Sequence, residues 1–254
     1  MPGDIFRAKW GNSVFTSGLQ LLKDKITQCH DLAILTGAGI SAESGVPTFR
    51  GEDGLWRQYR AVDLATPEAF RRDPRLVWEF YQWRRRLLHP LRPNPGHAAL
   101  AALEQRLPKV TVITQNIDGL HAMSGSKNII ELHGNIWYVR CTVCNQFQEN
   151  RELDLPPLPV CSQCGSLLRP HVVWFGENLD PAVLEKTYQA LQTCQVLIII
   201  GTSGFVQPAA SMGAFAKQHN AFVSEINLEV TPQSGIYDLN IQGKAGDLVP
   251  QLVP

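Results

Sequence analysis

The strongest constraint on the fold is a set of short aliphatic runs that alternate with longer segments of helical character. Four β-branched and aliphatic runs have the length of buried strands: Leu32–Thr36, Val110–Thr114, Val196–Ile200 and Ala221–Ile226. Four other segments have helical character: Gly18–His30, His97–Leu107, Pro181–Thr193 and Pro208–His219. Strands that alternate with helices predict an α/β fold with a parallel sheet covered on both faces. Binding loops in such folds follow the carboxyl ends of the strands.

Two stretches interrupt this alternation and predict a second, smaller lobe. Residues 51–95 are rich in Arg, Trp and Pro, and Asp73 followed by Pro74 marks a helix start, because Asp is a good N-cap and Pro suits the first helical position. Residues 136–172 contain four of the six cysteines and a proline cluster. We expect a Rossmann-like domain from 1–50, 96–135 and 173–254, with a helical insertion at 51–95 and a zinc-binding insertion at 136–172.

Four cysteines have the spacing of a zinc site. Two Cys-x2-Cys pairs separated by sixteen residues contain them: Cys141, Cys144, Cys161 and Cys164. Each pair can turn two sulfur atoms towards one ion, which replaces a hydrophobic core that so short a segment cannot build. Two disulfides or free thiols are the alternative. Cys29 and Cys194 stand alone, and we expect them to be buried thiols.

Composition narrows the class of protein and its partners. The 254 residues are 44% apolar and 18% charged, which predicts a globular protein with a core rather than a disordered chain. Lys plus Arg and Asp plus Glu both number 23, so the net charge is zero and nucleic acid is not favoured as a partner. The longest aliphatic run has five residues, whereas a membrane span needs about 20. Because residues 1–11 also lack the apolar stretch of a secretory signal, we expect a cytoplasmic protein.

A glycine-rich turn follows the first predicted strand. Residues 37–42 read Gly-Ala-Gly-Ile-Ser-Ala, a pattern in which glycines let the backbone approach a pyrophosphate and the next N–H groups favour the anion. The acidic residue usually found about 20 positions later, after a second strand, is missing. The turn is therefore not an ordinary dehydrogenase fingerprint, and by itself a simple glycine turn remains the alternative.

Polar side chains follow the other predicted strands. The amides and the carboxylate of residues 115–118 suit the binding of a carboxamide and a ribose. The alternative is a turn in which these side chains hydrogen-bond their own backbone. The imidazole of His133 suits a general base near neutral pH, although a lone histidine is often structural. Residues 201–203 and 227–229 offer groups for phosphate or ribose, or else form a helix N-cap and a polar turn.

Together these blocks resemble the signature motifs of the sirtuins, the NAD-dependent protein deacylases. Residues 37–50 resemble the family's first signature, 114–121 the second, and 132–134 the segment that holds its catalytic histidine. The four cysteines and three further blocks follow in the family's order, at 173–177, 201–203 and 226–229. The resemblance covers about residues 30–250 and implies NAD and Zn²⁺ as cofactors.

The resemblance implies a role for each motif. Gln115 would bind ribose, Asn116 and Asp118 nicotinamide, Phe49 would cover the nicotinamide pocket, and His133 would deprotonate the cofactor ribose. Cofactor contacts are implied for Gly37, Ala38, Gly39, Ser41, Ala42, Phe49, Arg50, Trp56, Gln115, Asn116, Ile117, Asp118, His133, Gly201, Thr202, Ser203, Asn227, Leu228, Glu229 and Ala245. The acylated peptide would pair as an added strand with Val173, Trp174, Phe175, Gly176 and Glu177. His121 is expected to be structural.

The helical insertion contains a candidate acyl pocket. Tyr81 and Arg84 are three residues apart, so they share one face of the predicted helix. A guanidinium matches a carboxylate with two hydrogen bonds, and residues 69–92 contain seven Arg against two acids. The alternative is a core tyrosine beside a solvated arginine face. The pair resembles the Tyr-x-x-Arg motif of class III sirtuins, which accept succinyl- or malonyl-lysine, and bacterial members of the CobB type carry it and still remove acetyl groups.

The resemblance therefore implies an NAD-dependent deacylase that removes acetyl and acidic acyl groups from protein lysines. Its products would be nicotinamide, free lysine and O-acyl-ADP-ribose, and its partners acylated lysine side chains; no membrane partner is expected, and the zero net charge does not favour nucleic acid. Zinc would not touch the reaction, because four thiolates leave no open position. One rival is an NAD-dependent ADP-ribosyltransferase. Another is a zinc-ribbon module that senses NAD without turnover, against which the presence of a base at position 133 argues.

Overall fold

The computed structural model of the chain describes residues 17–47, 55–56 and 59–254. Two predicted cofactor residues, Phe49 and Arg50, lie outside the described residues. Trp56 lies in the two-residue strand β2 (Leu55–Trp56), of which only the backbone is described. None of the helices in the described ranges is both long enough and apolar enough to traverse a bilayer.

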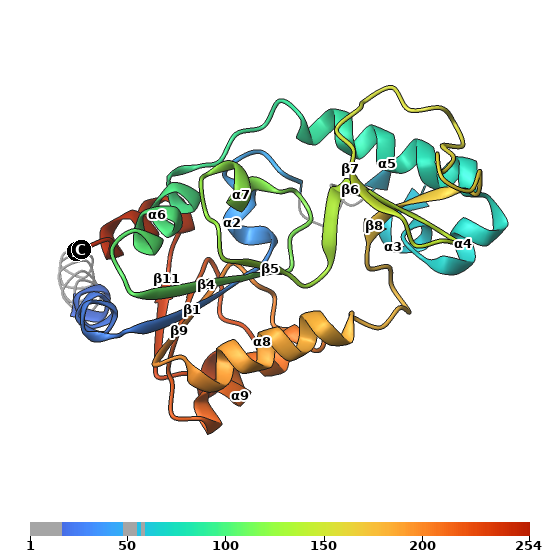
Figure 1. Cartoon of the computed structure of the whole chain (residues 1–254). Helices are drawn as coiled ribbons and strands as arrows, with labels where there is room; N and C mark the ends of the chain where they lie inside the picture. The colour runs from blue at the N-terminus through green and yellow to red at the C-terminus, as the bar shows by residue number, and fades with distance from the viewer. Residues whose placement is uncertain (1–16, 48–54, 57–58) are drawn as a thin grey trace, which may run out of the picture.

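A six-stranded parallel sheet forms the centre of the larger lobe (Figure 1). Its strand order is β11-β10-β9-β1-β4-β5, and every neighbouring pair is parallel. The strands are β1 (Asp31–Thr36), β4 (Lys109–Thr114), β5 (Ile129–Glu131), β9 (Val196–Ile200), β10 (Phe222–Asn227) and β11 (Leu239–Gln242). The four predicted strands are confirmed within one residue at each end. The two edge strands β5 and β11 are short and not continuously apolar, so the sequence pattern did not reveal them.

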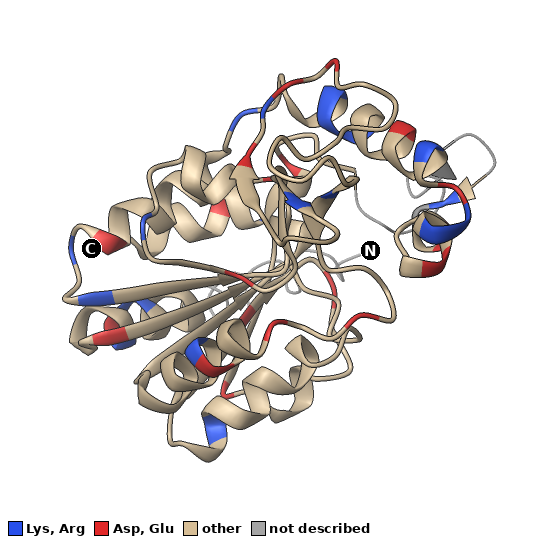
Figure 2. Cartoon of the chain, turned by 45° about the vertical axis from the view of Figure 1, so that its right-hand side comes forward, with Lys and Arg blue, Asp and Glu red and all other residues tan. Residues whose placement is uncertain are grey.

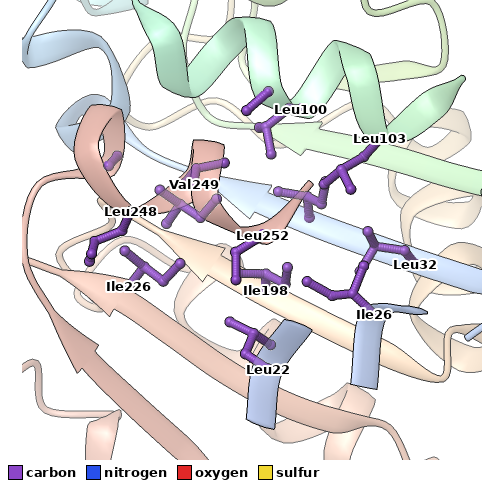
Figure 3. Packing of buried hydrophobic residues seen from close by; sticks show 14 of the residues in the cluster. Leu22, Ile26, Leu32, Leu100, Leu103, Ile198, Ile226, Leu248, Val249 and Leu252 are labelled. Atoms are coloured by element: carbon purple, nitrogen blue, oxygen red, sulfur yellow. The ribbon is translucent and has the colours of Figure 1, made fainter. Parts of the chain in front are cut away.

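Helices cover both faces of this sheet, as predicted. Because successive strand residues point to opposite faces, Leu32 and Ile34 join one core while Ala33 and Leu35 join the other. Figure 3 shows the first core, in which the helix at 17–28 packs with α6 (Pro95–Glu104), α10 (Ala245–Leu248) and the 3₁₀ turn η3 (Val249–Leu252). The second core is covered by α8 (Pro181–Thr193) and α9 (Ala209–Gln218).

Helix α6 begins two residues before the predicted start because its N-cap lies at Asn94. The Asn94 side chain accepts hydrogen bonds from the N–H groups of Gly96 and His97, and the His97 ring accepts the N–H of Asn94 in return. Pro95 occupies the first helical position, where its missing N–H costs nothing. A histidine in the third position of a capping box is not among the usual Glu or Gln signals.

The smaller lobe combines helices from one insertion with a sheet from the other. Helix α5 (Pro74–Leu88) begins as predicted, with Asp73 accepting the N–H of Leu76 at 3.0 Å. A three-stranded antiparallel sheet of order β7-β6-β8 packs against it. The lobe's elements are β2, β3 (Tyr59–Arg60), α3 (Ala61–Leu64), α4 (Pro67–Arg72), α5, β6 (Gly134–Cys141), β7 (Phe147–Glu149) and β8 (Leu168–Val172).

One hydrophobic cluster holds this lobe together. It contains Trp78 and Tyr81 of α5 together with Ile136 and Val139 of β6 and Leu168 of β8, all buried. The α/β fold with a smaller inserted lobe is therefore confirmed, while the residue boundaries of the three parts stay a prediction. Short elements complete the chain between strands: α2 (Ala38–Ala42), α7 (Leu120–Met123) and η2 (Ser234–Ile236).

Candidate active site

The glycine-rich loop after β1 packs directly against the loop after β9. Gly37 N–H donates to the carbonyl of Ile200 at 3.0 Å, and Gly39 N–H donates to that of Gly201 at 2.8 Å. A Cβ atom on Gly39 would lie 2.6 Å from the Cα of Gly201, so no larger residue fits without movement of backbone. We expected these glycines to leave room for a pyrophosphate. In this structure they leave room for the neighbouring loop, and the N–H groups of Gly37 and Gly39 donate to carbonyls at positions 200 and 201.

The amide side chains of the second motif point across to the neighbouring loops. Gln115 Nε2 donates to Thr202 Oγ1 at 3.0 Å. Asn116 Nδ2 donates to the carbonyl of Gly37 at 3.0 Å and to Ser41 Oγ at 3.1 Å. The alternative of a turn bonded to itself is thus wrong for these two amides. Three loops separated in sequence therefore converge at the carboxyl edge of the sheet.

Asp118 behaves differently from the two amides. Its Oδ1 atom accepts the N–H of Leu120 at 2.9 Å, so it does bond its own turn. Burial raises the pKa of its carboxyl, while the Leu120 N–H, the Ser41 hydroxyl and the charge of Arg84 act in the opposite direction. Asp118 therefore links the 115–118 loop electrostatically to Arg84 of helix α5.

His133 lies at the start of β6 with a defined tautomer. Its Nδ1 atom lies 2.9 Å from the carbonyl oxygen of Gln115. Because a carbonyl only accepts, the proton of the neutral ring is on Nδ1 and the lone pair is on Nε2. Burial lowers the pKa of His133, opposed by the Gln115 carbonyl, so the ring is neutral near pH 7. This arrangement can accept a proton at Nε2.

The loops after β9 and β10 are joined by one side chain. Asn227 Nδ2 donates to the carbonyl of Thr202 at 2.6 Å, and its Oδ1 accepts the N–H of Leu228 at 3.0 Å. Leu228 and Glu229 are exposed beside this junction. Ser203 Oγ accepts a weak hydrogen bond from the N–H of Phe205 at 3.4 Å. The loop after β9, with residues 202 and 203, and the loop after β10, with residues 227–229, thus adjoin through Asn227; we call these residues the rim of the site.

Ala245 does not join that rim through its side chain. It is 6% exposed and packs in the core at the start of α10. The neighbouring residue links this helix to the segment after α2, because Gly246 N–H donates to Glu43 Oε1 at 2.9 Å. Sequence reasoning did not single out this contact, since it joins residues 203 positions apart.

Tyr81 and Arg84 are both buried on helix α5. Tyr81 is 2% exposed and Arg84 is 8% exposed, whereas Arg86 on the same helix pairs at the surface with Asp154. The alternative of a solvated face at Arg85 and Arg86 thus holds for Arg86 but is wrong for Arg85, which is fully buried, whereas Tyr81 is a core residue as that alternative stated. The Tyr81 hydroxyl accepts the indole N–H of Trp174 at 2.9 Å, and burial raises its pKa to about 12. The pair lies between the cofactor loop at Asp118 and the predicted peptide segment at Trp174.

The segment from Val173 to Glu177 is a turn rather than an extended strand. Gly176 has φ +85°, and the N–H of Glu177 bonds the carbonyl of Trp174. The N–H groups of Val173 and Phe175 bond the carbonyls of His133 and Ala65, and that of Trp174 bonds the Glu177 carboxylate. Four N–H groups of this segment are therefore already bonded within the chain, and the pairing of a peptide with it as an added strand stays a prediction.

The four predicted zinc ligands lie together at one end of the small lobe. All four sulfur atoms lie within 4.8 Å of one another, with Cys141 and Cys164 at 3.4 Å and Cys144 and Cys161 at 3.7 Å. A tetrahedral zinc ion with Zn–S bonds near 2.3 Å requires sulfur separations of about 3.8 Å. None of the four is in a disulfide, so that alternative is wrong, and the donor set fits Zn²⁺. Cys29 and Cys194 are buried thiols, as predicted.

Two buried histidines lie behind the loops, and the sequence did not reveal them as a pair. The rings of His97 and His121 have centroids 4.9 Å apart. His97 Nε2 lies 3.4 Å from Ser41 Oγ, and His121 Nε2 lies 2.9 Å from Thr36 Oγ1. Burial lowers the pKa of His97 to about 4; burial and the neighbouring His97 lower that of His121 to about 3. Both rings are therefore neutral near pH 7, and each lies against a hydroxyl group of the site, His97 against that of Ser41 and His121 against that of Thr36.

Comparison with known proteins agrees with this geometry. The family model described as the Sir2 family matches residues 37–208. The chain belongs to the Sir2 family. An NAD-dependent protein deacylase of Pyrococcus furiosus is 51% identical to it over 236 residues, which are 90% of this chain and 94% of that protein.

Solved structures of Sir2 proteins have the same fold. A mutant Sir2 homologue in complex with 2′-O-acetyl ADP ribose is 48% identical, with a TM-score of 0.87, over 92% of this chain and 94% of that one. A Sir2–p53 peptide–NAD⁺ complex is 31% identical, with a TM-score of 0.82, over 92% of this chain and 96% of that one. The resemblance to sirtuins seen in the sequence is therefore confirmed.

Proposed function

We propose that this Sir2 protein is an NAD-dependent protein-lysine deacylase that removes acetyl, succinyl and malonyl groups. The observation that carries the proposal is the orientation of His133, whose Nδ1 is bonded to Gln115 and whose Nε2 keeps its lone pair. A protein that only binds a dinucleotide does not need such a base. The names of the relatives support the same reaction class.

NAD fits the edge where the loops after β1, β4, β9 and β10 converge. The juxtaposition of Gln115, Asn116 and Asp118 supports their assignment to ribose and nicotinamide. The rim at 201–203 and 227–229 supplies hydroxyl, amide and carboxylate groups for phosphate and ribose. We assign Gly37–Ala42 and the start of α10 to the same cofactor.

When bound, NAD would supply the ribose carbon that receives the acyl oxygen as nicotinamide leaves; with one water consumed, the acyl group would remain on the ribose and the lysine amine would be released. His133 accepts a proton from a ribose hydroxyl at Nε2, since Nδ1 is already protonated and held by Gln115. Burial keeps the ring neutral and ready for this transfer. His121 is not the base, because its Nε2 is engaged by Thr36 inside the protein.

Tyr81 and Arg84 support activity on acidic acyl groups. A guanidinium and a phenol buried side by side provide donors for a carboxylate at the end of an acyl chain. Desolvation lowers the pKa of Arg84, while Tyr81 and Asp118 act in the opposite direction. A carboxylate at the end of an acyl chain would stabilise the Arg84 cation in the same way as Asp118 does. A neutral acetyl group does not need this charge, and we therefore propose both activities.

Zinc is assigned a structural role. The four cysteines would hold the ion with thiolates only, which leaves no position for water or substrate. The cluster joins the end of β6 and the turn after it, at residues 141–144, to the turn at 161–164 that precedes β8, and Cys141 and Cys161 belong to the core of the small lobe. Zn²⁺ thus stabilises the lobe that carries Tyr81 and Arg84.

The alternative is transfer of ADP-ribose to protein from the same cofactor site. Incubation with NAD labelled in the adenosine half and an acetylated or succinylated peptide separates the two. We expect label in free O-acyl-ADP-ribose together with release of nicotinamide and unmodified lysine. Label fixed on protein, with the peptide's acyl group retained, would establish the transferase instead.

A further inference from the structure

A cavity of about 380 Å³ lies in the small lobe, between α4 and the sheet of β6 and β8. The Arg and Glu residues that line it are Arg71, Arg140, Arg169 and Glu177, three positive charges and one negative charge. Its apolar lining includes Phe70 and Trp174. Figure 2 shows Lys and Arg segments on the helices of this lobe. Cys141, a predicted zinc ligand, also lines the cavity, and two of the arginines are paired, Arg169 with Glu177 and Arg71 with Glu68.

The floor of the cavity is rigid. The guanidinium carbon of Arg169 lies 3.4 Å from the ring centre of Trp174, and the rings of Trp174 and Phe70 are 5.1 Å apart. Glu177 accepts two hydrogen bonds from Arg169, at 2.6 and 2.9 Å, and Arg169 also donates to the carbonyl of Val172. Arg169 and Glu177 therefore neutralise each other and hold a flat apolar surface in place.

The other two arginines keep donors for a ligand. Arg140 Nη2 lies 3.9 Å from Glu177 Oε1, beyond hydrogen-bonding distance. Arg71 pairs with Glu68 one turn earlier on α4, but both side chains are about two-thirds exposed, and such surface pairs exchange partners readily. A guanidinium has five N–H donors, so each of the two side chains can donate hydrogen bonds to a carboxylate. The rim thus presents two guanidinium groups above an apolar floor.

We propose that this cavity binds an acidic side chain of the substrate protein, a glutamate near the acylated lysine in sequence. This inference rests on the proposed deacylase function. The cavity is continuous with the predicted peptide segment, because Trp174 and Glu177 belong to both. The indole of Trp174 separates it from the acyl pocket: its N–H edge bonds Tyr81, while its ring face covers Arg169. The site therefore reads the peptide rather than the acyl group.

The test uses acetyl-lysine peptides in which one Glu is moved through each position flanking the lysine, with Gln at the same position as the matched control. Because the acetyl group is neutral, only the flanking carboxylate differs within a pair. At one position, or two adjacent ones, kcat/KM for Glu should exceed that for Gln by at least about 10-fold through KM, the lower end of the effect of one charge-assisted hydrogen bond.

The variants Arg71→Gln and Arg140→Gln should remove this preference while acting normally on the Gln peptides. Arg72→Gln is the matched control, because Arg72 is exposed on the same helix and does not line the cavity. Arg71→Glu, at an exposed position that does not threaten folding, should favour Lys over Glu at the same peptide position. Equal rates on all Glu and Gln pairs, or a preference that survives both Gln variants, would overturn the inference. Absence of deacylation from every peptide would instead refute the proposed function.

Discussion

The Nδ1 atom of His133 donates to the main-chain carbonyl of Gln115 at 2.9 Å, and so a residue of the proposed cofactor motif fixes the tautomer of the proposed base. The two residues are 18 positions apart, one following β4 and the other preceding β6. This one hydrogen bond therefore joins the orientation of the imidazole to the position of the 115–118 loop.

His133→Ala should lower turnover by about 10²-fold to 10⁴-fold, the usual contribution of a general base. The affinity for NAD should change little, because the base acts on the hydroxyl after binding. Steady-state deacylation and calorimetric titration of NAD measure the two quantities. His30→Ala, at an exposed position, is the matched control. Unchanged turnover in His133→Ala would refute the assigned role.

The pH profile should be displaced towards acid. A base must be neutral to accept a proton, and burial lowers the pKa of His133 below its ordinary value of 6.5. The neutral ring therefore persists to lower pH, and the acidic limb of log kcat/KM should fall with unit slope around a midpoint below 6.5. A midpoint above 6.5 on the acidic limb would contradict a buried, neutral imidazole.

Arg84→Met should separate the two acyl specificities. Loss of one partner of a buried charge pair costs about 3–5 kcal/mol, so kcat/KM on succinyl-lysine should fall by at least about 10²-fold. Activity on acetyl-lysine should change little. Arg86→Met, at an exposed position on the same helix, should affect neither substrate. Equal losses on both substrates would assign Arg84 a structural role.

Removal of zinc should unfold the small lobe and abolish activity indirectly. The cysteine cluster closes a lobe whose hydrophobic core includes Cys141 and Cys161. Chelation, or Cys144→Ser, should release one zinc per chain and reduce near-ultraviolet circular dichroism, because the lobe's tryptophans lose their fixed packing. A chelated protein that stays folded and fully active would be inconsistent with this role.

Acid should destabilise the fold through the buried histidine pair. The folded-state pKa values of about 4 for His97 and about 3 for His121 lie below the ordinary 6.5. The unfolded chain therefore binds more protons, and the unfolding free energy falls as pH drops below 6.5. Between pH 7.5 and 5.5 each histidine should contribute a loss of about 1 kcal/mol.

Urea titrations at these pH values measure that loss. His121→Gln should flatten the pH dependence by the share of one histidine, and His30→Gln, which alters an exposed ring, should leave it unchanged. An identical pH dependence in His121→Gln and the parent would contradict a pKa lowered by burial.

The sequence by itself determined the parallel sheet, the helix start at Asp73 and the cysteine cluster, because each follows from a short-range signal: strand-length aliphatic runs, a cap followed by proline, and paired thiols. Its motifs were also sufficient to indicate the Sir2 family. These features depend on residues close together in the chain.

Only the tertiary structure decided what each site residue touches. The orientation of His133, the burial of Arg84 beside Asp118, and the turn at 173–177 all depend on contacts between distant segments. The same holds for the arginine-lined cavity, where residues of α4, β6 and β8 meet around Trp174. Local sequence signals cannot specify such contacts, because they arise only when segments far apart in the chain pack against one another.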